Sequence, residues 1–209
     1  AVVNTDQAIR DSELFRQTIG APKVWLYGES YGTQLVQAYA SQFPTAVKGV
    51  IVDGVVDLTL TPEQFYRRYT LASEQLLAET FALCATLPAC KADMPDDAAK
   101  IYDDLAARIA AAPVSVPYTL ADGSTVQRSL TTDLLEANAF YALYSPEGRA
   151  EFLRTLAAAG RGNLVPMLQL GYSNMYIDPE TEIGMEDPGW FGAAYYAITC
   201  TDYGSGTGT

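Results

Sequence analysis

Residues 27–33 read Tyr-Gly-Glu-Ser-Tyr-Gly-Thr and contain the pattern Gly-x-Ser-x-Gly with Ser30 at its centre. The preceding residues, 23–27, form a short apolar run rich in β-formers, which predicts a buried strand. The following residues, 34–43, have helical periodicity and stop before Pro44. A strand, a tight turn with serine at its tip and a helix are together the setting in which this pattern presents a nucleophile.

The chemistry of such a turn explains its glycines. The turn holds Ser30 in a strained backbone conformation, so that its hydroxyl stands clear of the sheet. Gly28 and Gly32 lie two residues to either side, where strand and helix crowd together, and we expect a Cβ at either position to clash. The backbone N–H of Tyr31 is expected to form half of an oxyanion hole. The alternative is a chance occurrence of the pattern in a surface loop.

The composition indicates a folded globular protein of one large domain or two small ones. Hydrophobic residues make up 49% of the 209 residues and charged residues 18%, a balance unlike that of disordered chains. No apolar run reaches the roughly 18 residues of a membrane-spanning helix. The net charge of −12 is expected to repel nucleic acid and anionic membranes and to favour cationic ligands, although solubility alone accounts for many of the carboxylates.

Residues 5–19 are predicted to form a helix and residues 47–53 a second buried strand. The order helix, strand, helix, strand is typical of a parallel α/β sheet. Asp53 and Asp57 lie at or beyond the carboxyl end of the second strand, where such sheets bind ligands. Either one is a candidate triad acid, and the alternative is that it caps a loop. Glu29, beside the serine, is a candidate for contact with substrate or for packing behind the turn.

From residue 60 onward the pattern changes to mostly helices, so the predicted division is into residues 1–59, residues 60–203 and a flexible tail, 204–209. The first part holds the candidate nucleophile, and the second is predicted to be a mostly helical cap over it. Within the cap, residues 114–128 have the pattern of a β-hairpin with an Asp-Gly turn. Residues 171–189 are polar, acidic and without period, which predicts a loop.

The three cysteines indicate the redox environment of the protein. Cys84 and Cys90 are separated by five residues, a spacing that fits a small disulfide loop in an oxidising environment. Metal binding is the weaker alternative, because the chain contains no histidine and no second cysteine pair. Cys200 is left over, either as a buried thiol or as the partner of a cysteine outside this chain.

A serine nucleophile requires a general base, and this chain contains no histidine. In hydrolases with this turn the chain order is serine, acid, histidine. A lysine could act as the base instead, but none of the four lysines lies in a motif that indicates this role. We therefore expect the chain to be an internal fragment of a longer hydrolase, whose remaining part supplies the missing groups.

Several segments beyond the serine turn resemble one family. These segments are Tyr39-Ala40, Phe43-Pro44, the run Val-Asp-Gly-Val-Val-Asp at 52–57, the pair Cys84 and Cys90, and the run Ala-Ile-Thr-Cys-Thr-Asp at 197–202. Together they resemble the tripeptidyl-aminopeptidase-like branch of the α/β-hydrolases, relatives of the proline iminopeptidases, over about residues 4–203. The fold that this resemblance implies is α/β: a partial α/β-hydrolase sheet, made of the serine strand and the next strand, with a large mostly helical cap insertion.

The resemblance also implies an exported serine exopeptidase, secreted or periplasmic, that acts without a cofactor or metal. It would remove short peptides or single residues from a peptide substrate with a free N-terminus. Ser30 would be the nucleophile and Tyr31 would donate the oxyanion N–H. The acid and histidine of this family follow the cap, and Cys200 would pair with a cysteine in that later part.

An exopeptidase must also bind the ammonium group of its substrate. Glu180 and Glu182, in the acidic run 178–187, are candidates, and the alternative is a solvated loop. Trp190 is a candidate for lining a side-chain pocket, although aromatic residues at this spacing more often belong to a core. Two other functions stay open: an esterase or lipase with an apolar cap, and a non-catalytic chain that keeps the fold without the base.

Overall fold

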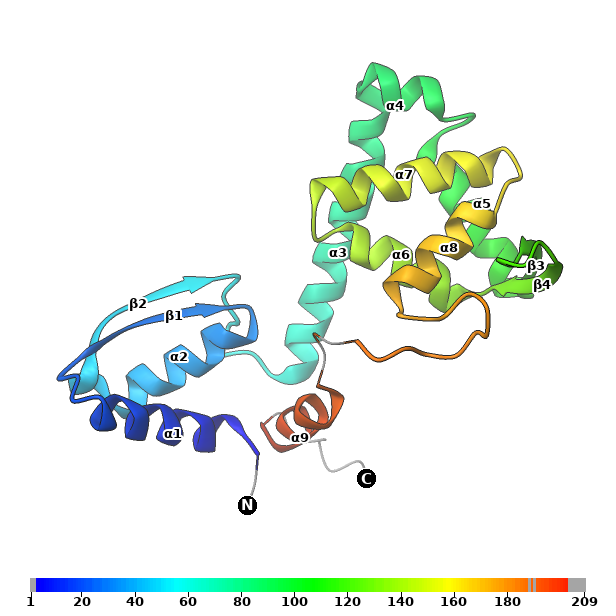
Figure 1. The fold of residues 1–209 in the computed structure, drawn as a ribbon. Helices are drawn as coiled ribbons and strands as arrows, with labels where there is room; N and C mark the ends of the chain where they lie inside the picture. Colours follow the sequence, from blue (N-terminus) through cyan, green and yellow to red (C-terminus); the bar gives the residue numbers. More distant parts are fainter. Residues whose placement is uncertain (1–2, 188, 190, 203–209) are drawn as a thin grey trace, which may run out of the picture. The chain divides into compact units, whose positions relative to one another are not determined.

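The computed structural model describes residues 3–187, residue 189 and residues 191–202. The chain forms two compact units, residues 1–67 together with 188–209, and residues 68–187 (Figure 1). This division falls after Arg67, eight residues beyond the shift in composition at residue 59. The single cap predicted for residues 60–203 stays a prediction.

The first unit contains a small parallel sheet covered by helices on one face. Its elements are α1 (Thr5–Thr18), β1 (Val24–Glu29), α2 (Tyr31–Gln42), the short 3-10 helix η1 (Pro44–Ala46), β2 (Val47–Asp53), the first turn of α3 and α9 (Gly192–Asp202). The predicted parallel pairing is confirmed, with Glu29 opposite Asp53 at the carboxyl ends of the strands. Helix α2 packs against both strands, and α1 packs against α2 (Figure 1).

The prediction that both strands are buried was wrong for one face of the sheet. Trp25 and Tyr27 are 62% and 61% exposed, and Ile51 on β2 is 55% exposed. Successive side chains of a strand point to opposite faces, and within the described residues α2 covers only one of them. The uncovered face therefore carries large apolar side chains.

A buried hydrogen bond joins α1 to α2 at a carboxylate that also forms an ion pair within α1. The Glu13 carboxylate accepts hydrogen bonds from Arg16 Nε (2.8 Å) and from the hydroxyl of Tyr39 (2.6 Å), whose side chain is 1% exposed. These bonds, Arg16 first and Tyr39 second, lower the pKa of Glu13 to about 2. The stabilisation is therefore present above the ordinary carboxylate pKa and is lost as the pH falls towards 2.

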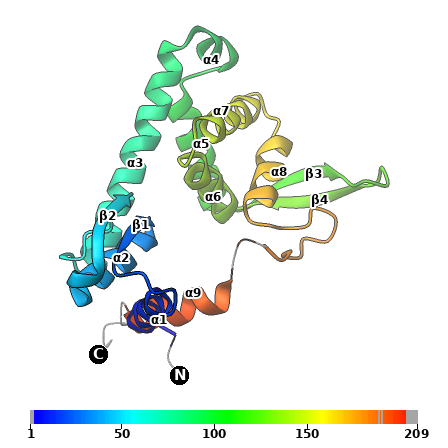
Figure 2. The ribbon, with the colours of Figure 1, turned by 60° about the vertical axis from the view of Figure 1, so that its left-hand side comes forward.

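The second unit is mostly helical. Its elements are the rest of α3 (Pro62–Thr86), α4 (Pro88–Asp93), α5 (Ala98–Ala111), β3 (Val114–Thr119), β4 (Thr125–Leu130), α6 (Thr132–Ala142), α7 (Pro146–Gly160) and α8 (Val165–Asn174). Helix α7 packs against α5, α6 and α8 around a core that includes Phe152, Leu156 and Leu168, all fully buried (Figure 2).

Two sequence predictions for this unit can be compared with its elements. The hairpin is confirmed as the antiparallel pair β3 and β4, and Gly123 adopts the positive φ of 85° that its turn needs. The loop predicted from residue 171 begins later, because α8 continues to Asn174 with Gly171 and Tyr172 buried. None of the described helices has the length and hydropathy needed to cross a membrane.

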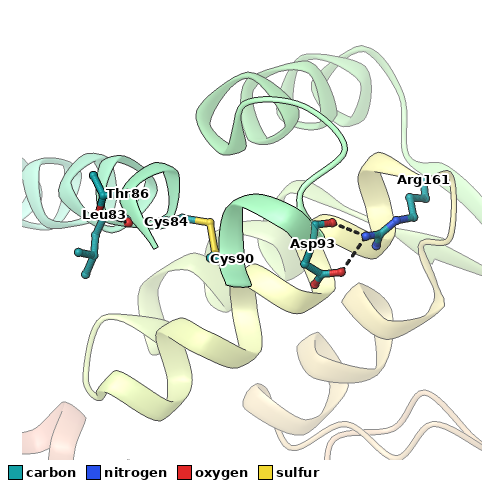
Figure 3. The surroundings of a disulfide bond; sticks show 6 residues. All are labelled: Leu83, Cys84, Thr86, Cys90, Asp93 and Arg161. Atoms are coloured by element: carbon teal, nitrogen blue, oxygen red, sulfur yellow. Dashed lines mark hydrogen bonds and ion pairs between the residues drawn. A yellow bond between two sulfur atoms is a disulfide. The ribbon is translucent and has the colours of Figure 1, made fainter. Parts of the chain in front are cut away.

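A disulfide bond joins the end of α3 to α4. Cys84, which is 1% exposed, bonds to Cys90 six residues later (Figure 3). On the same short helix the carboxylate of Asp93 pairs with Arg161 Nη2 at 2.7 Å, directly after α7 (Figure 3). Helix α4 is therefore held by the disulfide at its third residue and by the ion pair at its last. Cys200 on α9 is an exposed free thiol.

We expect reduction of the Cys84–Cys90 bond to lower the free energy of unfolding by about 2 kcal/mol, because the cross-link closes a short loop in the unfolded chain. Urea unfolding followed by circular dichroism, with and without reductant, measures this difference. The variant Cys200→Ser serves as the control, since replacing an exposed thiol is expected to change stability by less than about 0.5 kcal/mol. Equal stability of the oxidised and reduced chains would contradict the prediction.

Candidate active site

Ser30 stands at the tip of the turn between β1 and α2. β1 ends at Glu29 and α2 begins at Tyr31, so the serine is the only residue between the two elements. Its backbone has φ 51° and ψ −121°, and its side chain is exposed. A positive φ outside glycine costs on the order of 1–3 kcal/mol and persists only where its surroundings fix it. The predicted strand, strained turn and helix are therefore all present.

Hydrogen bonds from both sides fix this strained residue. The N–H of Ser30 donates to the carbonyl oxygen of Asp53 at 2.9 Å. The carbonyl oxygen of Ser30 accepts from both the N–H (2.9 Å) and the hydroxyl (2.7 Å) of Thr33. Thr33 is fully buried, and its hydroxyl oxygen also accepts from the N–H of Val56 at 2.9 Å. The turn is thus bonded to the end of β2 and to the loop that follows it.

The two glycines of the motif have different roles. A Cβ added to Gly28 would lie 2.3 Å from the carbonyl oxygen of Gly32 and 2.9 Å from the backbone nitrogen of Thr33. A Cβ added to Gly32 would meet no described atom within 4 Å. The expected clash is therefore present at Gly28, and the expectation for Gly32 was wrong. The crowding acts on one side, because the strand glycine faces the backbone of the helix and the helix glycine faces open space.

Tyr31 begins α2, so its N–H belongs to the first turn, where a helix has no acceptors of its own for its donors. The positive end of the helix dipole lies at the same place. The side chain is fixed separately, since the hydroxyl of Tyr31 lies 2.6 Å from the hydroxyl of Thr5 at the start of α1. This arrangement can stabilise a negative oxygen beside Ser30, although the role of Tyr31 in an oxyanion hole stays a prediction.

The carboxylates near the turn have different surroundings. Glu29 and Asp53 are paired in register at the carboxyl ends of their strands, and both are exposed. Glu29 is the main cause of the raised pKa of Tyr27, because its negative charge disfavours the phenolate, and desolvation and Asp53 add to the effect. Asp57 Oδ1 accepts from the N–H (3.0 Å) and hydroxyl (2.6 Å) of Thr59. Asp57 therefore caps its loop, and a catalytic role for either aspartate stays a prediction.

Glu180 and Glu182 belong to the second unit and have partners there. Arg128 Nη1 donates to Glu182 at 2.7 Å, and the hydroxyl of Tyr172 donates to the same carboxylate at 2.8 Å. Glu180 accepts from the N–H of Ala121 at 3.1 Å. These contacts attach the acidic loop to the β3–β4 hairpin and account for both carboxylates without a substrate. Substrate binding by either glutamate stays a prediction, and Trp190 lies outside the described residues.

Sequence patterns did not indicate a contact between the two ends of the first unit. The carboxylate of Asp202, the last residue of α9, accepts from the N–H of Thr5 at 3.1 and 3.2 Å and from its hydroxyl at 2.5 Å. The hydroxyl of Thr5 also bonds to Tyr31, as described above. The only sequence signal was the aspartate that ends the run at 197–202, because no spacing rule relates residues so far apart.

Comparisons with known proteins agree with this geometry. The family model described as the alpha/beta hydrolase fold matches residues 3–191. A putative hydrolase, YuaR, from Escherichia coli K12 is 32% identical over 92 residues, which cover 42% of this chain and 18% of that protein. The serine protease Hip1 of Mycobacterium tuberculosis H37Rv is 33% identical over 107 residues, which cover 50% of this chain and 20% of that protein. The matched part is therefore about a fifth of these relatives' length.

The two glycines give a matched pair of substitutions. We expect Gly28→Ala to destabilise the first unit by at least about 2 kcal/mol, because backbone atoms of α2 cannot move away from the new methyl group. Gly32→Ala is expected to be neutral or to stabilise by up to about 1 kcal/mol, because alanine favours the helix. Thermal unfolding of the two variants measures both effects. Equal losses at the two positions would contradict this reading of the turn.

Ser30 itself provides a test of backbone strain. We expect Ser30→Gly to be more stable than Ser30→Ala by about 1 kcal/mol or more, because glycine adopts a positive φ without the steric penalty of a Cβ. Both variants lack the hydroxyl, so the comparison isolates the backbone. Chemical denaturation monitored by tryptophan fluorescence, to which Trp25 of β1 contributes, is the measurement. An alanine variant at least as stable as the glycine variant would show that the turn is not strained.

Proposed function

The chain belongs to the alpha/beta hydrolase fold family, and on that premise we propose that it carries the nucleophile of a serine peptidase, Ser30. The observation that carries the proposal is the strained, exposed serine between β1 and α2, fixed by Asp53 and Thr33. More narrowly, we propose an exported aminopeptidase that releases short peptides or residues from a free N-terminus. The name of the relative Hip1, a serine protease, and the family resemblance of the sequence support this choice over an esterase.

The reaction would proceed by acyl transfer. The Ser30 oxygen attacks the carbonyl carbon of the scissile bond while a general base accepts the hydroxyl proton. The N–H of Tyr31 stabilises the negative oxygen of the tetrahedral intermediate. The base then returns the proton to the departing amine, and water attacks the acyl-enzyme to release the acid and restore the serine. Since the 209 residues contain no histidine, we propose that the base comes from outside them.

The proposed export is consistent with the cysteines. A disulfide bond such as Cys84–Cys90 persists in oxidising compartments and is rare in the cytosol. The exposed thiol of Cys200 is available for a second bond with a cysteine outside these residues. Secretion or a periplasmic location therefore belongs to the same proposal as the peptidase activity.

The test uses the intact protein that contains this chain. Tripeptidyl and aminoacyl p-nitroanilides with a free amine are compared with their N-acetylated forms and with p-nitrophenyl butyrate. We expect cleavage of the free-amine substrates, weak cleavage of the blocked ones, and loss of at least about a thousandfold in kcat/KM for Ser30→Ala. Preference for the ester without dependence on a free amine would contradict the peptidase proposal and identify an esterase.

A matched serine provides the control for this variant. Ser41 lies near the end of the same helix α2 and is exposed, so Ser41→Ala removes a hydroxyl from the same unit without touching the turn. It is expected to keep the activity of the intact protein. A fluorophosphonate probe adds a second readout, because it should label the protein in a manner that depends on Ser30. Full activity of the Ser30→Ala variant would overturn the assignment.

A further inference from the structure

The first unit contains a groove of about 300 Å³ beside the serine turn. It lies where the loop after β2, the first turn of α3 and the end of α9 meet the start of α2. Its apolar wall includes Val56, Leu58, Leu60 and Phe65, and its polar lining includes two acidic residues, Asp202 and Asp57, of which Asp57 is used in capping its own loop. Neither lysine nor arginine is among its lining residues. A cavity of this size, with an apolar wall facing polar and acidic groups, is large enough for a small ligand.

The groove begins close to the nucleophile. Gln34 lines it four residues after Ser30, and Val56, which also lines it, donates its N–H to the hydroxyl of Thr33, which in turn donates to the carbonyl oxygen of Ser30. Extended peptide residues span about 3.3–3.6 Å each. A short stretch of substrate whose carbonyl carbon reaches Ser30 can therefore extend towards this groove.

The charge in the groove has a fixed position. Asp202 is held by the N–H and the hydroxyl of Thr5, which are neutral donors and leave its negative charge uncompensated by those bonds. Thr5 is 7% exposed and also bonds to Tyr31, so the carboxylate is anchored next to the turn. A carboxylate oriented in this way beside an apolar wall matches a ligand that has a cation and an apolar group on neighbouring atoms.

We propose that this groove binds the N-terminal residue of the peptide substrate, with its α-ammonium group on Asp202 and its apolar side chain on the wall formed by Val56, Leu58 and Phe65. The proposal rests on the peptidase function proposed above and supplies its substrate class, peptides that begin with an apolar residue. It also assigns the ammonium to the first unit, whereas Glu182 in the acidic loop is already paired with the cation of Arg128.

Binding by the intact protein that contains this chain, carrying Ser30→Ala to prevent turnover, tests the proposal without catalysis. An isotope-labelled sample is titrated with leucinamide at mildly acidic pH, where the amine is protonated, and separately with 4-methylpentanamide, which has the same skeleton without the amine. We expect leucinamide to bind at least about tenfold more tightly, because a charge-assisted hydrogen bond is lost with the amine. The NMR signals of Val56, Leu58 and Leu60 should shift and saturate. Equal binding of both amides, no binding, or shifts confined to other residues would overturn the proposal.

A third ligand separates the N-terminus from other ammonium groups. N-acetyl-lysine amide has an ammonium group at the end of a flexible chain and no free α-amine. We expect it to bind at least about tenfold more weakly than leucinamide, because its cation and its apolar part cannot occupy the groove in the same way. Binding as tight as that of leucinamide would show a general cation site and would contradict the assignment to a peptide N-terminus.

Two variants with the same change in charge complete the experiment. Asp202→Asn keeps an oxygen that can accept from Thr5 but removes the negative charge, and it should weaken leucinamide binding by about tenfold. Asp11→Asn, on the exposed surface of α1, should leave the binding unchanged. An unaltered affinity of Asp202→Asn would overturn the role of Asp202. Because no turnover is measured, a negative result here is distinct from failure of the peptidase proposal, which the hydrolysis assays decide.

Discussion

The positive φ of Ser30 is the constraint on which the first unit depends. A non-glycine residue holds this conformation only when neighbouring groups leave it no alternative, and here those groups come from three segments. The end of β2 binds its N–H, the first turn of α2 binds its carbonyl oxygen, and Val56 binds the threonine that makes the second contact. The parallel register of the strands brings Asp53 to the turn, and the bare Cα of Gly28 lets the first turn of α2 approach the strand.

The local parts of this arrangement were predictable from the sequence. The strand, the turn and the helix follow from short-range rules about β-formers, glycine and helical periodicity, and the membership of the alpha/beta hydrolase fold family confirms the fold class. The same rules gave Gly28 and Gly32 the same role, because the sequence motif does not show which of the two glycines lies against the backbone of a neighbouring element. The same short-range rules predicted that the strand at 23–27 is buried on both faces. A sequence pattern shows which faces of a strand are apolar, but it does not show whether another layer of the protein covers them.

The remaining features depend on contacts between distant residues. Arg128 lies on β4 and Glu182 lies 54 residues later, yet their pairing decides that part of the acidic loop is attached to the hairpin. The side chain of Arg128 is only 11% exposed and also donates to the carbonyl oxygens of Pro179 and Glu180. The composition of the loop indicates a negative charge but no ordered structure. The cation that orders the loop, Arg128, lies outside the loop's own sequence. A charge count in a single stretch therefore says little about which carboxylates are available to a ligand.

The hydrogen bond between Thr5 and Asp202 can form only after both residues have been synthesised. The two residues are 197 positions apart, so a ribosome that adds about 5–20 residues per second needs roughly 10–40 s to make the second after the first. During that interval the residues of β1, the turn and α2 have been synthesised, but the carboxylate of Asp202 that binds Thr5 has not. The contact that holds Thr5, the hydroxyl partner of Tyr31, can therefore form only after the helical unit has been synthesised.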